Sequence, residues 1–256
     1  MKKEKKLAPA YDDPDFMHSR EARSLRILSE YLEPEKRFRD MNINHTVVFF
    51  GSARTRPDGT ADEQRYYHMA ADFAFALANL SREIERETGN PFYICTGGGP
   101  GIMEAANLGA TRAGTQSIGL NIDLPFEQAP NKYITPELMF KFHYFFMRKL
   151  WFLYQAKAFI IFPGGYGTMD ELFETLTMVQ TRKMEKINVP ILLYDREFWS
   201  DIINFDRLAS DGFISREDTG LFNYFSEIQE GIDFLRPKLI TLMKNIDYYL
   251  KMRFPI

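Results

Sequence analysis

Short apolar runs alternate with longer amphipathic segments along this chain. The apolar runs are rich in β-branched and aromatic side chains and are bounded by polar or turn-forming residues, which is typical of buried strands. They lie at residues 46–50, 92–96, 116–122, 158–162 and 189–194, with a shorter run at 222–225. The segments between them place apolar side chains three and four residues apart, which predicts helices. These lie at about 61–87, 102–113, 168–184, 198–209 and 228–249, and an apolar segment at 139–156 is expected to contain a further helix.

Strands that alternate with helices predict a parallel sheet with right-handed crossovers. The expected fold class is therefore α/β, a Rossmann-like doubly wound parallel sheet flanked by helices, formed by residues 45–256 as a single domain. Residues 1–44 are expected to form a disordered start, up to about residue 13, and then a helical arm that is broken near Pro34. We expect this arm to pack on the domain or on a second subunit.

Composition narrows the class of protein. Of the 256 residues, 45% are hydrophobic and 26% charged, and the formal charge of −3 gives no basic footprint for nucleic acid. No apolar run approaches the roughly 20 residues that span a bilayer, and no hydrophobic segment follows the lysine-rich start as in a secretory signal. Cys95 is the single cysteine, and no Cys/His cluster indicates zinc. We therefore expect a cytoplasmic protein that requires no metal and no cofactor.

Three loops that follow predicted strands have the composition of ligand-binding turns. The first begins with Gly51 and Ser52, the second spans residues 97–101 with four glycines and a proline, and the third runs from Pro163 to Thr168. In a parallel sheet all three lie at the carboxyl edge of the strands, where open α/β sheets bind ligands. Their backbone N–H groups at helix starts suit an anion such as phosphate.

The same residues leave other interpretations open. Thr168 and Glu171 have the spacing of a capping box, and Ser52 is as good a candidate for a cap as for a ligand contact. The second loop lacks the G-x-G-x-x-G spacing of dinucleotide-binding folds, although Asp123 keeps that interpretation open, and the Walker pattern is absent. Asn121 and Asn131 are candidates for contacts with a base or ribose, and equally for turn chemistry.

Three segments carry a more specific pattern: residues 98–105 read GGPGIMEA, Arg148 is followed directly by Lys149, and residues 163–171 read PGGYGTMDE. Over about residues 45–210, they closely resemble the LOG, or lonely guy, family. The resemblance implies a phosphoribohydrolase that cleaves the N-glycosidic bond of AMP or N6-modified AMP (cytokinin riboside 5′-monophosphate), giving free base and ribose 5-phosphate. The family's catalytic arginine and glutamate map onto Arg148 and Glu171.

The resemblance and the loop positions also assign residues to substrate and phosphate binding. These are Gly51, Ser52, Gly98, Gly99, Gly101, Met103, Glu104, Lys149, Pro163, Gly164, Gly165, Tyr166, Gly167 and Thr168. The family often has M-H-x-R-K around its arginine, whereas residues 145–149 here read FFMRK, and the missing histidine leaves the base preference open. The arm and the segment after residue 210 resemble the larger bacterial branch of the family.

The chemistry is consistent with these assignments. Cleavage of a purine N-glycosidic bond develops positive charge on the ribose. An ionised carboxylate either stabilises this charge directly or activates the water that attacks C1′. We expect Glu171 to take this role, with Arg148 orienting it, lowering its pKa and contacting ribose or phosphate. Glu104, one turn into its helix, favours a structural or dipole-related role, although it is close enough to touch ribose.

A second class of function stays open, namely a non-catalytic protein of the same fold that binds a nucleotide or carries molybdenum cofactor. Such a carrier has no need for Arg148 and Glu171 together. A PLP-dependent lysine decarboxylase is rejected, because nothing in the sequence supplies a PLP cradle. The expected partner is a small-molecule nucleoside monophosphate, not nucleic acid or a membrane. The aromatic surface near residues 140–155 and the family suggest a homodimer or an assembly of dimers.

Overall fold

A seven-stranded sheet forms the centre of the protein. The computed structural model describes residues 9–125, 129–183 and 189–244. In the described residues, all paired strands are parallel, in the order β4-β3-β2-β1-β5-β6-β7. The strands are β1 (Thr46–Phe50), β2 (Tyr93–Thr96), β3 (Ser117–Ile122), β4 (Met139–Phe142), β5 (Ala156–Ile161), β6 (Ile191–Tyr194) and β7 (Asn223–Phe225). The predicted Rossmann-like α/β fold is therefore confirmed.

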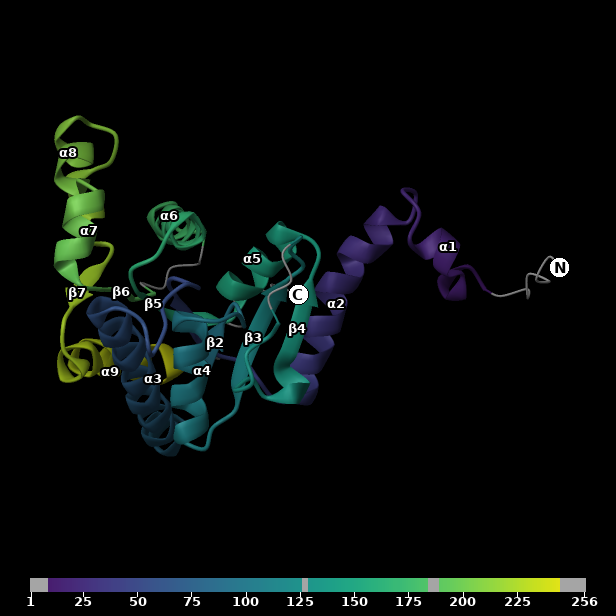
Figure 1. The fold of residues 1–256 in the computed structure, drawn as a ribbon, viewed down its shortest axis with the longest axis horizontal. Coiled ribbons are helices and arrows are strands. Elements are labelled where there is room, and N and C mark those ends of the chain that lie inside the picture. Colours follow the sequence, from purple (N-terminus) through teal and green to yellow (C-terminus); the bar gives the residue numbers. More distant parts are fainter. Residues whose placement is uncertain (1–8, 126–128, 184–188, 245–256) are drawn as a thin grey trace.

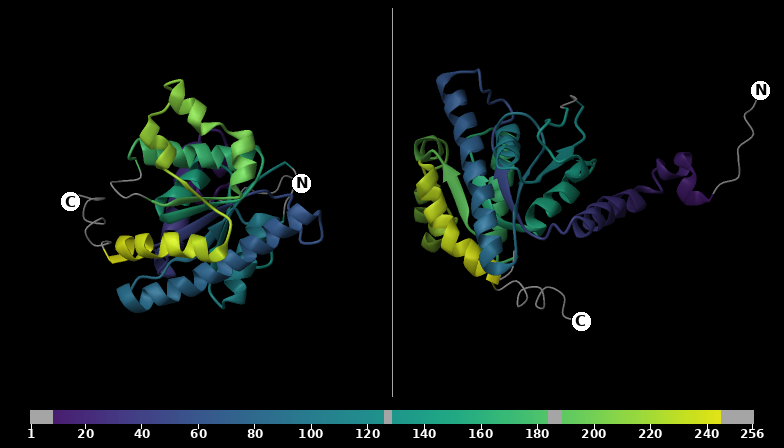
Figure 2. Two further views of the ribbon diagram at one scale, coloured as in Figure 1. Left: turned by 90° about the vertical axis from the view of Figure 1, so that its left-hand side faces the viewer. Right: turned by 90° about the horizontal axis from the view of Figure 1, so that it is seen from below.

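Helices cover both faces of this sheet. The helices of the described residues are α1 (Pro14–Met17), α2 (Arg23–Asp40), α3 (Ala61–Thr88), α4 (Ile102–Arg112), α5 (Phe145–Tyr154), α6 (Tyr166–Gln180), α7 (Arg196–Ile202), α8 (Phe205–Ser210) and α9 (Ile228–Lys244), of which α1 lies on the arm, away from the sheet. Helices α3, α4 and α9 lie below the sheet in Figure 1, and α5, α6 and α7 lie above it, as the left view of Figure 2 also shows.

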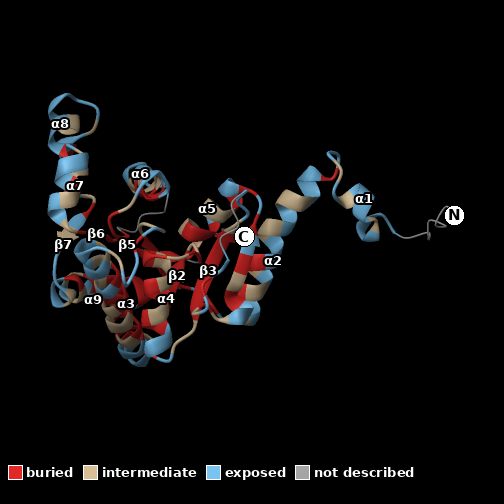
Figure 3. Ribbon diagram, in the orientation of Figure 1, coloured by how far each residue is buried: buried red, intermediate tan, exposed pale blue. Residues whose placement is uncertain are grey.

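The central strand β1 shows why the sheet needs two layers of helices. All five of its residues are buried, which is what a continuous apolar run predicts for a strand covered on both faces. Because side chains alternate along a strand, Val47 and Phe49 join the hydrophobic cluster with α3, α4 and α9. Val48 and Phe50 join the opposite cluster with α2, α5, α6 and α7. Figure 3 shows the buried sheet between the more exposed outer helices.

The order of the strands fixes where a ligand can bind. From β1 the chain moves to β2 on one side, and the chain later returns to place β5 on the other side of β1. The direction of winding therefore reverses between β1 and β5. Open α/β sheets bind ligands in the crevice at the carboxyl ends of the strands that flank such a reversal.

The arm differs from its prediction at Pro34. Helix α2 continues through Pro34, and the arm is interrupted instead between α1 and α2, at residues 18–22. Proline has no N–H to give to the carbonyl of Glu30, four residues earlier. The indole Nε1 of Trp151 donates to that carbonyl at 3.1 Å, so the carbonyl keeps a partner. Of the start predicted to be disordered, residues 1–8 lie outside the described residues, and Ala10–Asp12 form a short 3₁₀ turn.

Two further segments each contain two secondary-structure elements where the sequence indicated one. The apolar segment 139–156 contains the edge strand β4 as well as helix α5, because Met139–Phe142 pair with β3. The expected helix at 198–209 is two helices, α7 and α8. Asn204 stands between them, and its side chain accepts the backbone N–H of Arg207 and so caps α8. The predicted division of the chain at residue 45, between the arm and a single domain, stays a prediction.

Within the described residues, no helix combines the length and the apolar character needed to cross a membrane.

Candidate active site

The three glycine- and serine-containing loops meet at the carboxyl ends of β1, β2 and β5. The backbone N–H of Ser52 donates to the carbonyl of Pro163 at 3.0 Å, and the N–H of Ile102 donates to the carbonyl of Ser52 at 3.0 Å. Ser52 therefore joins the first loop to both of the others. Gly101 has φ near 71°, and a Cβ at this position would lie 2.2 Å from the Ser52 carbonyl oxygen, so only glycine permits this approach.

A cavity of about 750 Å³ opens where these loops meet. Its volume lies within the range of about 300–1,000 Å³ that is usual for small-molecule sites. The predicted site residues that line it are Gly51, Ser52, Met103, Arg148, Gly165, Tyr166, Gly167, Thr168 and Glu171. The sheet thus brings together residues that are far apart in the sequence and that come from the first loop, α4, α5 and α6.

Arg148 and Glu171 form a buried pair that lines this cavity. Arg148 comes from α5 and Glu171 from α6, and their closest charged atoms, Nη2 and Oε1, are 3.8 Å apart. This distance is an ion-pair contact but is too long for a hydrogen bond. The side chains are only 15% and 8% exposed, and the buried Nε of Arg148 has no hydrogen-bond partner among the described residues. A buried guanidinium with an unused donor is typical of a site that receives an anionic or oxygen-rich ligand.

Burial sets the protonation of Glu171. Desolvation raises the pKa of its carboxyl group to about 7, although the positive charges of Lys149 and Arg148 act to lower it. Arg148 acts in the expected direction, but the loss of water outweighs the attraction between the two charges, so the net shift of the Glu171 pKa is upward. Desolvation also lowers the pKa of Arg148, but a guanidinium stays protonated in proteins.

Thr168 lies inside the first turn of α6 and does not cap it. The helix begins at Tyr166, its N-cap is Gly165, and no side chain caps it, so Thr168 and Glu171 do not form the capping box that was one of the two open interpretations. Gly165 is extended, and the helix starts directly after it, two residues before Thr168. Thr168 Oγ1 lies against Gly164, where a Cβ would stand only 2.1 Å away. The hydroxyl therefore packs against the glycine loop, and Thr168 lines the cavity.

Lys149 points away from the cavity. Its Nζ is 2.8 Å from Asp170 and 2.8 Å from Glu174, both on α6. The lysine thus joins α5 to α6 beside Glu171, and no contact with the cavity supports its predicted binding role.

The other predicted residues surround the cavity without lining it. Gly101 and Glu104 line an adjoining hollow of about 530 Å³, together with Arg54 and Arg56. The carbonyl of Gly99 accepts the side-chain amide of Asn131, and Gly98 packs against the side chain of Asn121. The two asparagines therefore support the second loop. Pro163 and Gly164, at the beginning of the third loop, contact Ser52 and do not line the cavity.

Several lining residues were not assigned to the site individually, although some of them lie in the predicted loops. They are Phe50, Ala53, Arg54, Gly97, Phe152, Met169 and Ile202. Arg54 had a signal in the sequence, because it stands two residues after Ser52 in a loop at the correct edge of the sheet. Ile202 had no such signal in the sequence, because only the packing of α7 in the folded protein brings it to the cavity.

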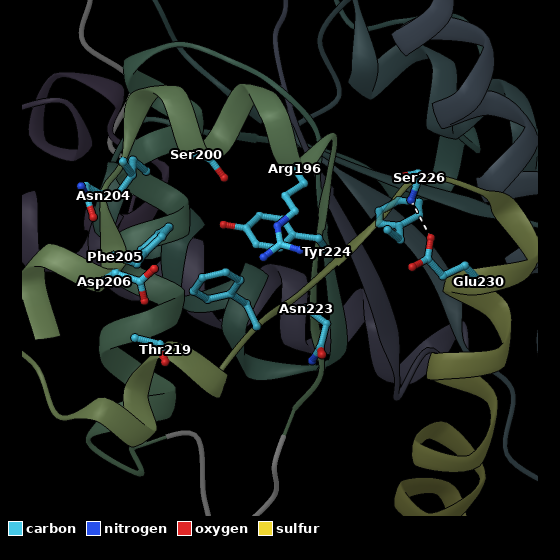
Figure 4. A pocket seen from close by; sticks show the side chains of 13 residues that line it. Arg196, Ser200, Asn204, Phe205, Asp206, Thr219, Asn223, Tyr224, Ser226 and Glu230 are labelled. Atoms are coloured by element: carbon cyan, nitrogen blue, oxygen red, sulfur yellow. Dashed lines mark hydrogen bonds between the residues drawn. The ribbon is translucent and has the colours of Figure 1, made fainter.

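A second hollow, of about 720 Å³, contains none of the predicted site residues. It lies beside α7 and β7, where the guanidinium of Arg196 stands 5.2 Å from the centre of the Tyr224 ring (Figure 4). Within the described residues we also find no group of three His, Cys, Asp or Glu side chains arranged to hold a metal ion.

Comparison with known proteins places the chain in a family. The family described as "Possible lysine decarboxylase" matches residues 103–235, more than half of the sequence. The chain belongs to this family, the LOG family. The match includes Arg148, Glu171 and the whole third loop.

Two plant relatives and one solved structure illustrate the range of LOG-fold similarity. A probable cytokinin riboside 5′-monophosphate phosphoribohydrolase of Oryza sativa subsp. japonica is 28% identical over 186 residues, which are 69% of this chain and 75% of the relative. A cytokinin riboside 5′-monophosphate phosphoribohydrolase of Arabidopsis thaliana is 43% identical over 61 residues, 24% of this chain and 28% of the relative. The molybdenum cofactor binding protein of Rippkaea orientalis is 16% identical with a TM-score of 0.52, covering 77% of this chain and 98% of that one, and so shares the fold.

Proposed function

We propose that this LOG-family protein is a phosphoribohydrolase that cleaves the N-glycosidic bond of AMP or N6-modified AMP, releasing the free base and ribose 5-phosphate. The observation that carries the proposal is the buried pair of Arg148 and Glu171, which faces a cavity bounded by the glycine loops. A cationic fork and a carboxyl group with a pKa of about 7 are suited to a reaction that develops positive charge on a sugar.

The start of α6 supports phosphate as the group that anchors the substrate. Backbone N–H groups at the beginning of a helix attract anions, and α6 has no side-chain cap to occupy them. Gly165 and Gly167 line the cavity, and a Cβ at either position would meet no atom within 4 Å. Packing within the described chain therefore gives no reason for glycine at these two positions. Close approach of a ligand to the backbone does give one.

In this proposal the N-glycosidic bond breaks with its electron pair moving to the base nitrogen. The ionised form of Glu171 stabilises the positive charge on C1′ and the ring oxygen, and accepts a proton as a water oxygen bonds to C1′. The departing base takes a proton from the solvent and Glu171 then releases its proton to the solvent, so one water is consumed and the products are the neutral base and ribose 5-phosphate. Arg148 holds the ribose or phosphate in place, because its planar fork can donate to two oxygens at once.

The site favours this reaction over the two alternatives. A carrier of molybdenum cofactor or a nucleotide sensor does not require a carboxyl group of raised pKa paired with a buried arginine. The likeness to a molybdenum cofactor binding protein is at 16% identity and concerns the fold. A PLP-dependent decarboxylase needs a lysine for its Schiff base, and none of the described residues that line the cavity is a lysine.

Incubation with AMP and with adenosine tests the proposal. We expect adenine and ribose 5-phosphate to appear in equal amounts from AMP, measured by chromatography, and a far slower release of adenine from adenosine. The phosphate supplies binding energy that positions the distant C1′. GMP, CMP and N6-isopentenyl-AMP, used in parallel, establish the base preference. Release of base from none of these monophosphates would refute the proposed reaction.

We also propose that the protein acts in the cytoplasm as a homodimer or an assembly of dimers. Phe145, Phe146 and Leu150 on α5 are 49%, 51% and 36% exposed, and apolar side chains of this size at one surface favour a protein interface. The surface is continuous with the element that carries Arg148, so assembly would bring a second copy close to the site.

A further inference from the structure

Helix α5 carries Arg148 but lacks the usual features that stabilise the start of a helix. Its N-cap residue, Tyr144, makes no side-chain capping bond, and its first turn contains no acidic residue. The backbone N–H groups at a helix start need partners, and a negative charge there is favourable. In α5 a carboxylate from outside the helix supplies the negative charge and accepts the N–H of the N-cap residue and of the residue before it.

The partner is Glu30, on the N-terminal arm. One carboxylate oxygen of Glu30 accepts the backbone N–H of His143 at 2.8 Å, and the other accepts the N–H of Tyr144 at 3.1 Å. The carbonyl of Tyr144 in turn accepts the N–H of Arg148 at 3.2 Å. A chain of two hydrogen bonds therefore runs from the Glu30 carboxylate to the backbone of the proposed catalytic arginine.

The backbone of Glu30 holds the same helix at a second point. Pro34 leaves the Glu30 carbonyl without its partner within α2, and Trp151 Nε1 donates to it at 3.1 Å. The indole ring also packs against Tyr31 and Phe38, with ring centres 5.6 and 5.4 Å apart. Arg148 lies between the two points of attachment, which are residues 143–144 and Trp151.

The Arg148 side chain depends on this support. Its Nε has no hydrogen-bond partner within the described residues, and its ion pair with Glu171, at 3.8 Å, is longer than a hydrogen bond. The position of the guanidinium is therefore set mainly by α5, whose Phe145 and Phe152 rings lie 5.3 and 5.5 Å from it. Displacement of a catalytic group by about 1 Å can slow a reaction on the order of 100-fold.

We propose that Glu30 is a positioning residue for Arg148, so that the N-terminal arm is part of the catalytic unit. The arm lies outside the residues that the family model matches, 103–235, and Figure 1 shows α2 running along the side of the sheet next to β4 and α5. This inference rests on the proposed phosphoribohydrolase activity for its kinetic consequence. Its structural consequence, the stabilisation of α5, does not depend on that activity.

Kinetics of Glu30→Ala and Glu30→Gln test the kinetic consequence. We expect Glu30→Ala to lower kcat for AMP roughly 10-fold with KM changed less than threefold, and Glu30→Gln to retain more activity because its amide oxygen still accepts one N–H. In an Arg148→Ala background, Glu30→Ala should lower the residual rate no further, since the group that it positions is gone. Glu33→Gln is the matched control: it removes a carboxylate from the same helix that pairs with Arg37 and makes no described contact with α5.

Amide hydrogen exchange of residues 145–154 tests the structural consequence. We expect Glu30→Ala to accelerate exchange in α5 while β1 and β5 keep their protection, and Glu33→Gln to change neither. Normal kcat and normal exchange in Glu30→Ala would overturn the inference, as would an equal loss of rate with and without Arg148. If no monophosphate is cleaved by the native protein, the proposed function fails. The exchange result then still decides whether Glu30 holds α5.

Discussion

Glu171 lies where burial and charge act in opposite directions on one carboxyl group. Removal from water raises its pKa, while Lys149 and Arg148 lower it, and the result is a pKa of about 7. A group with this pKa is present in both protonation states near neutral pH, which is the condition in which general bases are most effective. The sequence could predict the identity of this residue from the glycine motif. The sequence could not predict whether the pKa of Glu171 is raised or lowered, because the burial of the carboxyl group depends on how α5 and α6 pack together.

The first prediction concerns pH. If the ionised form of Glu171 acts, kcat/KM for AMP should rise about tenfold per pH unit below pH 7 and level off above it. Lys149→Met should move this rise to higher pH, because it removes the positive charge that lowers the Glu171 pKa most. The second ionisation of the substrate phosphate, near pH 6, is common to both proteins and cannot produce this displacement. Identical pH profiles for the two proteins would contradict the assignment.

The same pKa shift predicts a change in stability. The folded-state pKa of Glu171 is raised from 4.5 to about 7, so the folded protein binds this proton more tightly than the unfolded chain. Its contribution to stability is full below about pH 4.5 and is lost as pH rises through 7. Glu171→Gln should therefore stabilise the protein by about 1–3 kcal/mol at pH 8 and have little effect at pH 4.5. Thermal unfolding at the two pH values measures this, and equal Tm changes at both would refute it.

At the level of secondary structure, the glycine loops and α6 show which features a sequence can and cannot predict. The turn chemistry of residues 163–168 correctly placed a loop between a buried strand and a helix. The exact start of α6 was wrong by two residues, since Thr168 suited an N-cap as well as an interior position. The strand β4 was missed for a different reason. Its four residues are as apolar as α5, and only their pairing with β3 distinguishes them.

A prediction for α6 follows from the space around Gly167. An alanine there would meet no described atom within 4 Å, and alanine is about 0.5–1 kcal/mol more favourable than glycine in a helix. Gly167→Ala should therefore have an equal or higher Tm, while its KM for AMP rises about 10-fold or more because the methyl group displaces the phosphate from the backbone. Gly220→Ala, whose Cβ also has open space but lies outside the cavity lining, is the control. Native KM in Gly167→Ala would show that no ligand approaches this turn.

For the molecule as a whole, the alternation of strands and helices was sufficient to predict the parallel sheet and the meeting of three loops at one edge. The hydrogen bonds of Ser52 with the other two loops follow from that topology. The support that the N-terminal arm gives to α5 could not be predicted from this alternation. Glu30 has no motif, and its contact with α5 spans more than one hundred residues of sequence.

The prediction for the whole molecule concerns its oligomeric state. Light scattering should give at least twice the chain mass of 29.9 kDa, because exposed aromatic side chains on α5 favour a shared interface. Phe146→Glu should lower the mass toward that of a single chain. Phe213→Glu, at a site that is 77% exposed but far along the chain from α5, should leave it unchanged. A monomeric mass for the native protein would remove the proposal of a homodimer.

The most direct test of the account is the rate of adenine release from AMP by the native protein, by Glu171→Gln and by Arg148→Ala. We expect adenine and ribose 5-phosphate from the native protein, and a loss on the order of 100-fold or more in each variant, the usual effect of removing one preorganised charged group. Calorimetric titration of the native protein with AMP accompanies the assay. Binding of AMP with no release of adenine would contradict the catalytic role of the pair and would favour a carrier or sensor. Release that survives both substitutions would show that the reaction takes place elsewhere.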